Sequence, residues 1–334
     1  MLPSKIGLWH FTVSLLQTQW LVRSLRVEVS KDFPLGSQIE NLAFRPSGKV
    51  LAVVYTTPTI YEVPIIANSN PRLIATFQNT LGVSSIAYSS KPDVYYVITG
   101  NFSFQTLSPT PGSYAIHRLS FDTRTDKPST REIARLDAIS QPNGMVHVPN
   151  TPYVLIADSR AGFIFRFNTR TLELAKYFDH PLLKPNGTFL VLGVNGIKLS
   201  RGYLYFSNTN QQLVARIKAS GTERSLSGTP EIVASGMPVD DFTVNDFNGD
   251  LYLAEPGDLN ALGVVRNRGD STTPITLVGG QNTTSLLFPT AVIWAKNAQG
   301  RLLIVSNSGD PNQFLTGNFI GGGRLNFVHV GERV

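Results

Sequence analysis

The chain contains no cysteine. This absence excludes disulfides, thiol catalysis and cysteine-ligated metals, and it leaves the redox compartment undetermined. No apolar run approaches the length of about 18 residues that a membrane span requires, so we expect no membrane span. A G-x-S-x-G elbow is also missing, so nothing in the sequence supports the nucleophile of an α/β-hydrolase.

Charged residues are few, at 16% of the chain, and the excess of Lys and Arg gives a formal net charge of +6. The basic residues are scattered along the sequence, whereas a nucleic-acid-binding protein concentrates them on one face or in one run. We therefore expect no nucleic-acid partner. The charge fits a surface of mild cationic character, which favours an anionic ligand.

The residues that are abundant indicate an all-β fold. Hydrophobic residues make up 42% of the chain, which is enough to bury a core, and 28 Gly and 21 Pro spread along its length indicate many tight turns. Helix and strand patterns do not alternate, which argues against a doubly wound sheet.

A short pattern recurs six times: two small or polar residues followed by a short strand. The copies are ENLAF, SSIAY, NGMVH, NGIKL, DDFTV and TAVIW, which begin at Glu40, Ser84, Asn143, Asn195, Asp240 and Thr290. Successive copies start 44 to 59 residues apart, the length of a four-stranded antiparallel blade with its loops. The pattern predicts a six-bladed β-propeller around a central channel.

We assign residues 31–334 to a single propeller domain and residues 1–30 to an N-terminal extension. LRVEV (25–29) is a candidate for the outer strand of the last blade. The extension is also a candidate remnant of a targeting segment. Against a functional signal peptide, Gln17, Thr18 and Gln19 interrupt its apolar stretch and no small-residue cleavage site follows.

The innermost strand of each blade lines the channel, so the first residues of the six copies should converge on one axis. All six carry a side-chain oxygen and two are carboxylates, which are costly to bury without a partner. A hard cation would satisfy them: Ca²⁺ first, with Mg²⁺ or Mn²⁺ as alternatives. The competing interpretation is that these residues cap strand ends or hold ordered water.

Other residues could complete such a site. His147 follows Asn143 on the same strand face and is a candidate catalytic group, with a packed structural histidine as the alternative. The loops YTTPTIY (55–61), GNFSF (100–104), AEPGDLNAL (254–262) and NSGDPNQFLTGNF (307–319) are candidates for the rim. Their aromatic and leucine content suggests a partly apolar small-molecule substrate.

The repeat resembles the regucalcin and gluconolactonase superfamily of six-bladed propellers over about residues 36–332. The phrases PTPGSYAIHRLSF, LGVNGIKLSRGYLYFSNTNQ and PVDDFTVNDFNGDLYLA are most similar to a fungal branch of it. That branch includes hetero-Diels–Alderases of tropolonic sesquiterpenoid pathways. Its members are often secreted, so the resemblance favours the secretory pathway without deciding the localisation.

The resemblance also implies a site. In the lactonases of the superfamily a Glu, two Asn and an Asp hold a divalent cation, and by motif these fall on Glu40, Asn143, Asn195 and Asp240. DFTVNDFNGD carries one residue more than the usual spacing, and Asp241 is adjacent. We choose Asp240 because it shares the register of Asn195 relative to the apolar strand positions.

Three functions follow as expectations. The first is a fungal natural-product pericyclase, in which the pocket holds a heterodiene against a terpene alkene and Asn143, Asn195 or the cation polarises a carbonyl. The second is a metal-dependent lactonase, in which Asp240 orients or deprotonates water and Glu40 supplies anionic ligation. The third is a non-catalytic binding propeller. None of them needs an organic cofactor, and the sequence leaves the substrate, the stereochemistry and the oligomeric state open.

Overall fold

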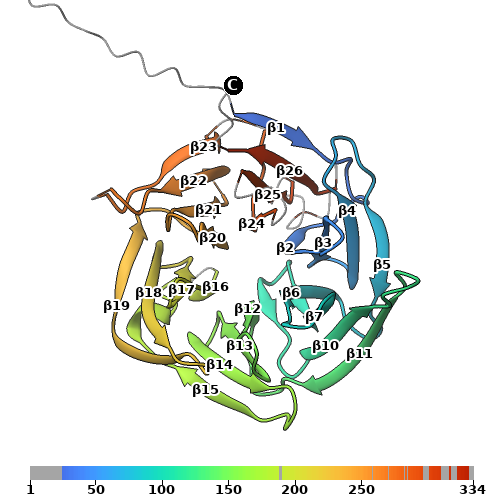
Figure 1. The fold of residues 1–334 in the computed structure, drawn as a ribbon, viewed down its shortest axis with the longest axis horizontal. Helices are drawn as coiled ribbons and strands as arrows, with labels where there is room; N and C mark the ends of the chain where they lie inside the picture. Colours follow the sequence, from blue (N-terminus) through green and yellow to red (C-terminus); the bar gives the residue numbers. More distant parts are fainter. Residues whose placement is uncertain are drawn as a thin grey trace, which may run out of the picture.

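The computed structural model describes residues 25–330, without 188–189, 258, 270, 282, 284, 296–300, 310–315 and 317–321. Residues 1–24, which include the candidate targeting segment, lie outside the described residues, as does most of the candidate rim loop 307–319. The described strands form six four-stranded antiparallel sheets arranged in a ring (Figure 1). The predicted six-bladed β-propeller is confirmed.

Each sheet is one blade, and the innermost strands are β2, β6, β12, β16, β20 and β24 (Figure 1). Blade 1 consists of β2 (Ile39–Phe44), β3 (Lys49–Val54), β4 (Thr59–Pro64) and β5 (Arg72–Thr76). Blade 2 consists of β6 (Gly82–Tyr88), β7 (Val94–Gly100), β10 (Ala115–Phe121) and β11 (Pro128–Arg135), with a small hairpin of β8 (Phe102–Ser103) and β9 (Ser108–Pro109) inserted between β7 and β10. Blade 3 consists of β12 (Pro142–His147), β13 (Tyr153–Asp158), β14 (Phe163–Asn168) and β15 (Leu174–Phe178).

The second half of the ring repeats this order. Blade 4, which follows the short 3₁₀ helix Pro181–Leu183, consists of β16 (Val194–Ser200), β17 (Tyr203–Asn208), β18 (Leu213–Ser220) and β19 (Ser225–Ser235). Blade 5 consists of β20 (Phe242–Val244), β21 (Leu251–Glu255), β22 (Ala261–Val265) and β23 (Ile275–Gly279). Blade 6 consists of β24 (Val292–Trp294), β25 (Leu302–Asn307), β26 (Arg324–His329) and β1 (Arg26–Val29).

The ring closes by pairing the two ends of the described chain. β1 runs antiparallel to β26, from the pair Arg26 and His329 to the pair Val29 and Asn326, and the Ser30 amide donates to the Leu325 carbonyl at 2.9 Å. This pairing ties the last blade to the start of the chain. It also covers a strand edge that would otherwise be open to pairing with another chain.

Apolar side chains fill each interface between neighbouring blades. Six buried clusters lie between successive blades, one per interface. Middle strands are therefore covered on both faces, and β3 (KVLAVV) reads as a nearly continuous apolar run. Outer strands face solvent, and β11 (PSTREIAR) is polar and largely exposed. In the part of the chain that the structure describes, no helix is both long and apolar enough to span a bilayer.

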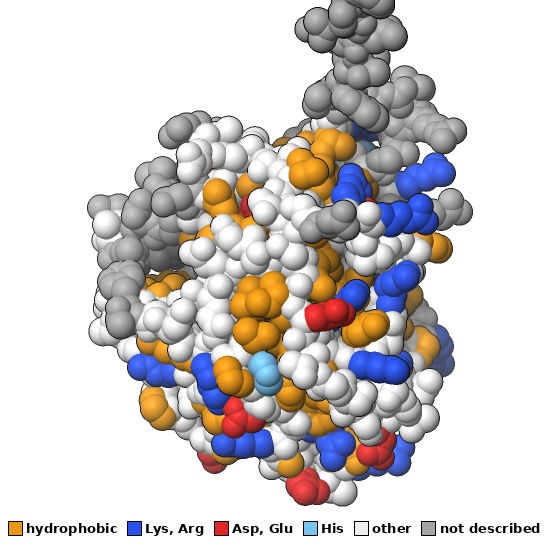
Figure 2. Space-filling view, turned by 90° about the vertical axis from the view of Figure 1, so that its left-hand side faces the viewer, with side chains coloured by type: hydrophobic (Ala, Val, Ile, Leu, Met, Phe, Trp, Pro, Cys, Tyr) orange, Lys and Arg blue, Asp and Glu red, His pale blue; other side chains and the backbone are white. Residues whose placement is uncertain are grey.

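The surface bears charges of both signs. In Figure 2 the Lys and Arg side chains lie in several separate places of the face shown, between apolar and acidic side chains. This distribution agrees with the scattered basic residues of the sequence.

A β-bulge recurs near the start of the inner strands. Regular pairing is interrupted between Ile39 and Asn41 in β2, between Val83 and Ser85 in β6, between Pro142 and Met145 in β12, and between Val194 and Ile197 in β16. The residues left unpaired include Glu40, Ser84, Asn143 and Asn195. A bulge re-aims its extra side chain away from the regular pleat. In blades 1 to 4 the first residue of the repeated pattern therefore stands on a bulge, whereas the pairings of β20 and β24 show no such shift.

The glycines of the two NG pairs make room between adjacent inner strands. A Cβ on Gly144 would lie 2.3 Å from the Asn195 carbonyl oxygen and 2.8 Å from the Gly196 Cα. A Cβ on Gly196 would lie 2.2 Å from Oδ1 of Asp241. Only a residue without a side chain permits this approach, which explains why glycine follows each asparagine.

We expect Gly144→Ala to destabilise the propeller by about 2 kcal/mol, because the added methyl group meets backbone atoms that cannot rotate away. The midpoint of urea unfolding measures this loss. Gly269→Ala is the matched control, since its Cβ would come no closer than 3.5 Å to any atom, and we expect a change within about 0.5 kcal/mol. Equal midpoints for the two variants would contradict the close packing of β12 against β16.

Candidate functional site

A cavity of about 230 Å³ lies where the inner strands begin. Its polar lining consists of Gln38, Glu40, Gln141, Asn143, Asn195 and Asp240, and its apolar lining consists of Tyr55, Phe102, Phe104, Leu107, Leu190, Leu192 and Phe288. The four residues predicted as metal ligands, which are up to 200 positions apart in the chain, thus line one cavity. The bulges and the ring geometry bring them together.

The other two members of the predicted collar do not line this cavity. Thr290 is buried, and its Oγ1 donates to the Ile39 carbonyl at 2.6 Å and lies 2.7 Å from Oγ of Ser306. Ser84 is buried in β6. Thr290 therefore links blade 6 to blade 1, which is the strand-capping role that the sequence analysis held as an alternative.

The structure distinguishes Asp240 from its neighbour Asp241. Asp240 lines the cavity and accepts a hydrogen bond from Nδ2 of Asn195 at 2.7 Å. Asp241 instead binds Nζ of Lys198 at 2.6 and 2.7 Å and accepts the Phe242 amide at 2.8 Å. Asp241 therefore has Lys198 as its ion-pair partner, and Asp240 is the carboxylate left for the cavity.

No cation among the described lining residues balances Glu40 and Asp240. Burial raises the pKa of Glu40 well above its usual value, and the nearby carboxylates of Asp240 and Asp241 raise it further. Burial and the charge of Asp241 raise the pKa of Asp240 to about 8, against the opposing effect of the hydrogen bond from Asn195. At neutral pH the pair therefore retains a proton unless a cation compensates it.

Asn195 leaves an acceptor unused. Its Nδ2 donates to Asp240 and to Oγ1 of Thr209, the latter at 2.9 Å, whereas its buried Oδ1 has no hydrogen-bond partner. An unsatisfied buried acceptor costs on the order of 1–3 kcal/mol. A ligand that brings a donor or a positive charge to this oxygen would recover that cost.

The oxygen atoms of Glu40, Asn143, Asn195 and Asp240 fit a hard cation. Two carboxylates and two amides offer oxygen ligands of the kind that Ca²⁺ takes, and the unpartnered Oδ1 of Asn195 is one of them. Among the residues that the structure describes, no three His, Asp or Glu side chains gather into a metal-binding group. Any cation here would therefore depend on the amides of Asn143 and Asn195.

An aromatic cluster faces this polar floor. Tyr55 stacks on Phe102 with ring centroids 5.3 Å apart and meets the edge of Phe104 at 5.5 Å, and the two Phe rings are themselves 5.3 Å apart. The inserted β8–β9 segment supplies both Phe residues. The candidate loops 55–61 and 100–104 thus contribute to the cavity, whereas the described residues of 254–262 and 307–309 do not line it.

Several lining residues were missed by the sequence analysis. Gln38, Gln141 and Phe288 each lie two positions before the first residue of a repeated motif. A step of two along an extended chain returns to the same face, so this signal was available in the repeat. Leu107, Leu190 and Leu192 come from irregular connections and carry no such periodicity.

His147 does not join the other four candidates. It is buried at the opposite end of β12 from Asn143, with Nε2 at 2.9 Å from the Thr151 carbonyl and Nδ1 at 3.3 Å from Oγ of Ser90. Burial lowers its pKa, and its side chain is absent from the lining of the cavity. These contacts favour the structural role that was weighed for it.

No protein-family model matches the chain. Two fungal proteins are similar to it, and both carry the name "Putative hetero-Diels-Alderase". The protein of Phoma sp is 25% identical over 315 residues, which cover 86% of this chain and 85% of the relative. The protein of Sarocladium schorii is 27% identical over 248 residues, 65% of this chain and 60% of the relative. The resemblance expected from the sequence is confirmed.

Solved structures share the fold. The crystal structure of regucalcin from Agrobacterium tumefaciens, described as a calcium-binding protein, superposes with a TM-score of 0.56 over 90% of this chain and 96% of that one, at 15% identity. At this identity the likeness concerns the propeller architecture alone.

The raised pKa of Asp240 predicts a pH-dependent stability in the presence of a chelator. A carboxyl group that holds its proton more tightly when folded destabilises the protein as the pH rises from about 4, its unfolded pKa, towards its folded value of about 8. Between pH 5 and 8 we therefore expect the free energy of unfolding of Asp240→Asn to rise by about 3–4 kcal/mol relative to that of the unaltered protein. Urea unfolding at each pH measures this gain.

The exposed Asp137 supplies the control, and we expect Asp137→Asn to follow the unaltered protein at every pH. A difference between Asp240→Asn and the unaltered protein that stays constant from pH 5 to 8 would mean that Asp240 is ionised in the folded state.

Proposed function

We propose that this protein is a small-molecule enzyme that accelerates a hetero-Diels–Alder addition, joining a reactive heterodiene to the alkene of a terpene in the cavity. The division of the cavity into an aromatic wall and a polar, proton-bearing floor carries the proposal. The similarity to two fungal proteins named for this reaction supports it.

The reaction needs no nucleophile and no net proton transfer. Two σ bonds form as the π electrons of the heterodiene and the alkene reorganise, so atoms and electrons balance between the two substrates. The protein contributes by holding the two substrates together. The effective molarity gained in this way can lower the activation barrier by on the order of 7–11 kcal/mol. Tyr55, Phe102 and Phe104 offer the apolar surface against which an alkene would pack.

The floor of the cavity activates the heterodiene. The proton retained by Glu40 and Asp240 makes a carboxyl O–H available as a donor, and Nδ2 of Asn143, in the same lining, offers a second donor. A hydrogen bond to the heterodiene carbonyl lowers the energy of its acceptor orbital and stabilises the charge that develops there. A divalent cation held by Glu40, Asn143, Asn195 and Asp240 would supply Lewis acidity at the same place.

Lactone hydrolysis is the second candidate, because the same four donors fit a cation and the fold is that of regucalcin. Here Asp240 would orient or deprotonate the attacking water, and its pKa of about 8 suits a base that works near neutral pH. Asn143 and Asn195 would fix the geometry as neutral ligands. This reaction differs from cycloaddition in requiring an ionised carboxylate.

We expect Phe104→Ala to lower kcat/KM for the addition of an o-quinone methide heterodiene to a polyene terpene by about tenfold, because the alkene loses its aromatic wall. Product formation above the buffer rate, followed by chromatography, measures the effect. Phe247→Ala is the control, since Phe247 is 82% exposed and does not line the cavity. A product ratio and a rate equal to those in buffer would rule out the cyclase.

The double variant Glu40→Gln with Asp240→Asn separates the two reactions. The amides keep the shape and hydrogen-bond donors of the floor but remove its charge, so we expect Ca²⁺ binding to fall at least about 100-fold. Calorimetry with Ca²⁺ and a lactone panel, with and without chelator, are the measurements. A cyclase keeps a rate within about tenfold of the original because amide donors remain. A lactonase loses its activity in this variant and in chelator, and such a result would overturn the proposed addition.

A further inference from the structure

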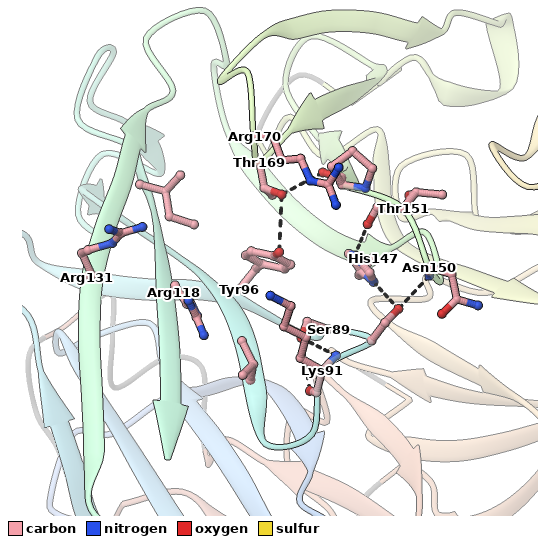
Figure 3. A pocket seen from close by; sticks show the side chains of 14 residues that line it. Ser89, Lys91, Tyr96, Arg118, Arg131, His147, Asn150, Thr151, Thr169 and Arg170 are labelled. Carbon is pink, nitrogen blue, oxygen red and sulfur yellow. Dashed lines mark hydrogen bonds between the residues drawn. The ribbon is translucent and has the colours of Figure 1, made fainter. Parts of the chain in front are cut away.

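A second pocket, of about 360 Å³, lies between blades 2 and 3 (Figure 3). Blade 2 contributes Tyr96 of β7, Arg118 of β10 and Arg131 of β11, and blade 3 contributes His147 and Arg170. It shares none of its described lining residues with the channel cavity. Neither reaction considered above uses it.

The lining of this pocket is cationic. Lys91, Arg118, Arg131 and Arg170 contribute four positive charges, and the described lining contains no Asp or Glu. None of these four residues forms an ion pair with another described residue. Lys198, by contrast, forms an ion pair with Asp241. The pocket needs a negative charge from outside.

Two of the arginines face each other directly. Arg118 of β10 and Arg131 of β11 are cross-strand partners in the antiparallel ladder, and like charges in that position are destabilising. In addition, Nε of Arg118 is buried and has no hydrogen-bond partner. An anion between the two guanidinium groups would relieve the repulsion and satisfy this donor.

The opposite wall is held in place by hydrogen bonds. Oγ of Ser90 accepts the Asn150 amide at 2.8 Å and lies 3.3 Å from Nδ1 of His147, whose Nε2 is 2.9 Å from the Thr151 carbonyl (Figure 3). These contacts connect the turn that carries Lys91 to blade 3. The pocket is therefore preorganised, which lowers the entropy cost of binding.

We propose that this pocket binds a small molecule that carries a phosphate or diphosphate group. The planar guanidinium groups of Arg118 and Arg131 match the oxygen geometry of phosphate, and Lys91 and Arg170 add two further positive charges. The volume exceeds that of a phosphate group, and Val94, Ile133 and Pro152 provide apolar surface for an organic substituent.

Calorimetric titration with inorganic pyrophosphate at low ionic strength tests the site. We expect one equivalent to bind, with an affinity that falls as salt is added. Arg131→Gln, at an exposed position, and Arg118→Gln should each weaken binding at least about tenfold. Arg124→Gln, an exposed arginine of the loop between β10 and β11 that lies outside the pocket, should change it less than about twofold.

Further titrations with ADP and geranyl diphosphate test which organic molecule carries the diphosphate group. Tighter binding of either one than of pyrophosphate supports a site for that organic diphosphate. Absence of pyrophosphate binding, equal affinity for sulfate and pyrophosphate, or equal losses in Arg131→Gln and Arg124→Gln would each overturn the proposal. Thermal unfolding of every variant without ligand verifies that a lost affinity does not come from a lost fold.

Discussion

The bulge near the start of the inner strands is the constraint on which the candidate site depends. In a regular ladder the first side chain of each repeat would stand on a sheet face and pack between blades. The interrupted pairing at Glu40, Asn143 and Asn195 re-aims these side chains instead. The ring then converts four positions that are remote in the sequence into the floor of one cavity.

Burial of negative charge follows from that convergence. Lys198 compensates Asp241, but no described side chain does the same for Glu40 and Asp240, so the proton or cation they hold becomes part of the site. The glycines that follow Asn143 and Asn195 belong to the same arrangement, because they let adjacent inner strands approach closely enough to place carboxyl and amide groups in contact. Burying these carboxylates lowers the stability of the fold, and it places polar groups at the floor of the cavity.

The two pockets have opposite character. The channel cavity combines acidic groups with an aromatic wall, whereas the pocket between blades 2 and 3 gathers cations without acidic partners. A chain whose net charge is only +6 thus contains a strongly cationic site, because a ring of blades can bring residues from two sheets to one interface. His147 lies at this second pocket, although its spacing from Asn143 suggested the first.

The sequence by itself determined the architecture and the register of the site. A period of about 50 residues with a strand pattern in each copy indicates repeated blades, and equivalent strand starts should converge on the axis, which named six candidates from Glu40 to Thr290. The family resemblance then selected Glu40, Asn143, Asn195 and Asp240 among them. The same reasoning extended by two positions would have found Gln38, Gln141 and Phe288. Periodicity fixes which side of a strand a residue occupies, but it does not fix how far along the channel it lies.

Only the tertiary structure decided what depends on distance between blades. It separated Asp240 from Asp241 through the position of Lys198, placed His147 at the far end of its strand, and brought the β8–β9 segment over the cavity. It also set Arg118 opposite Arg131 and beside Arg170 of the next blade. Contacts between blades, such as that of Lys198 with Asp241, join residues whose separation along the chain bears no relation to their separation in space, because they are made where two sheets pack together.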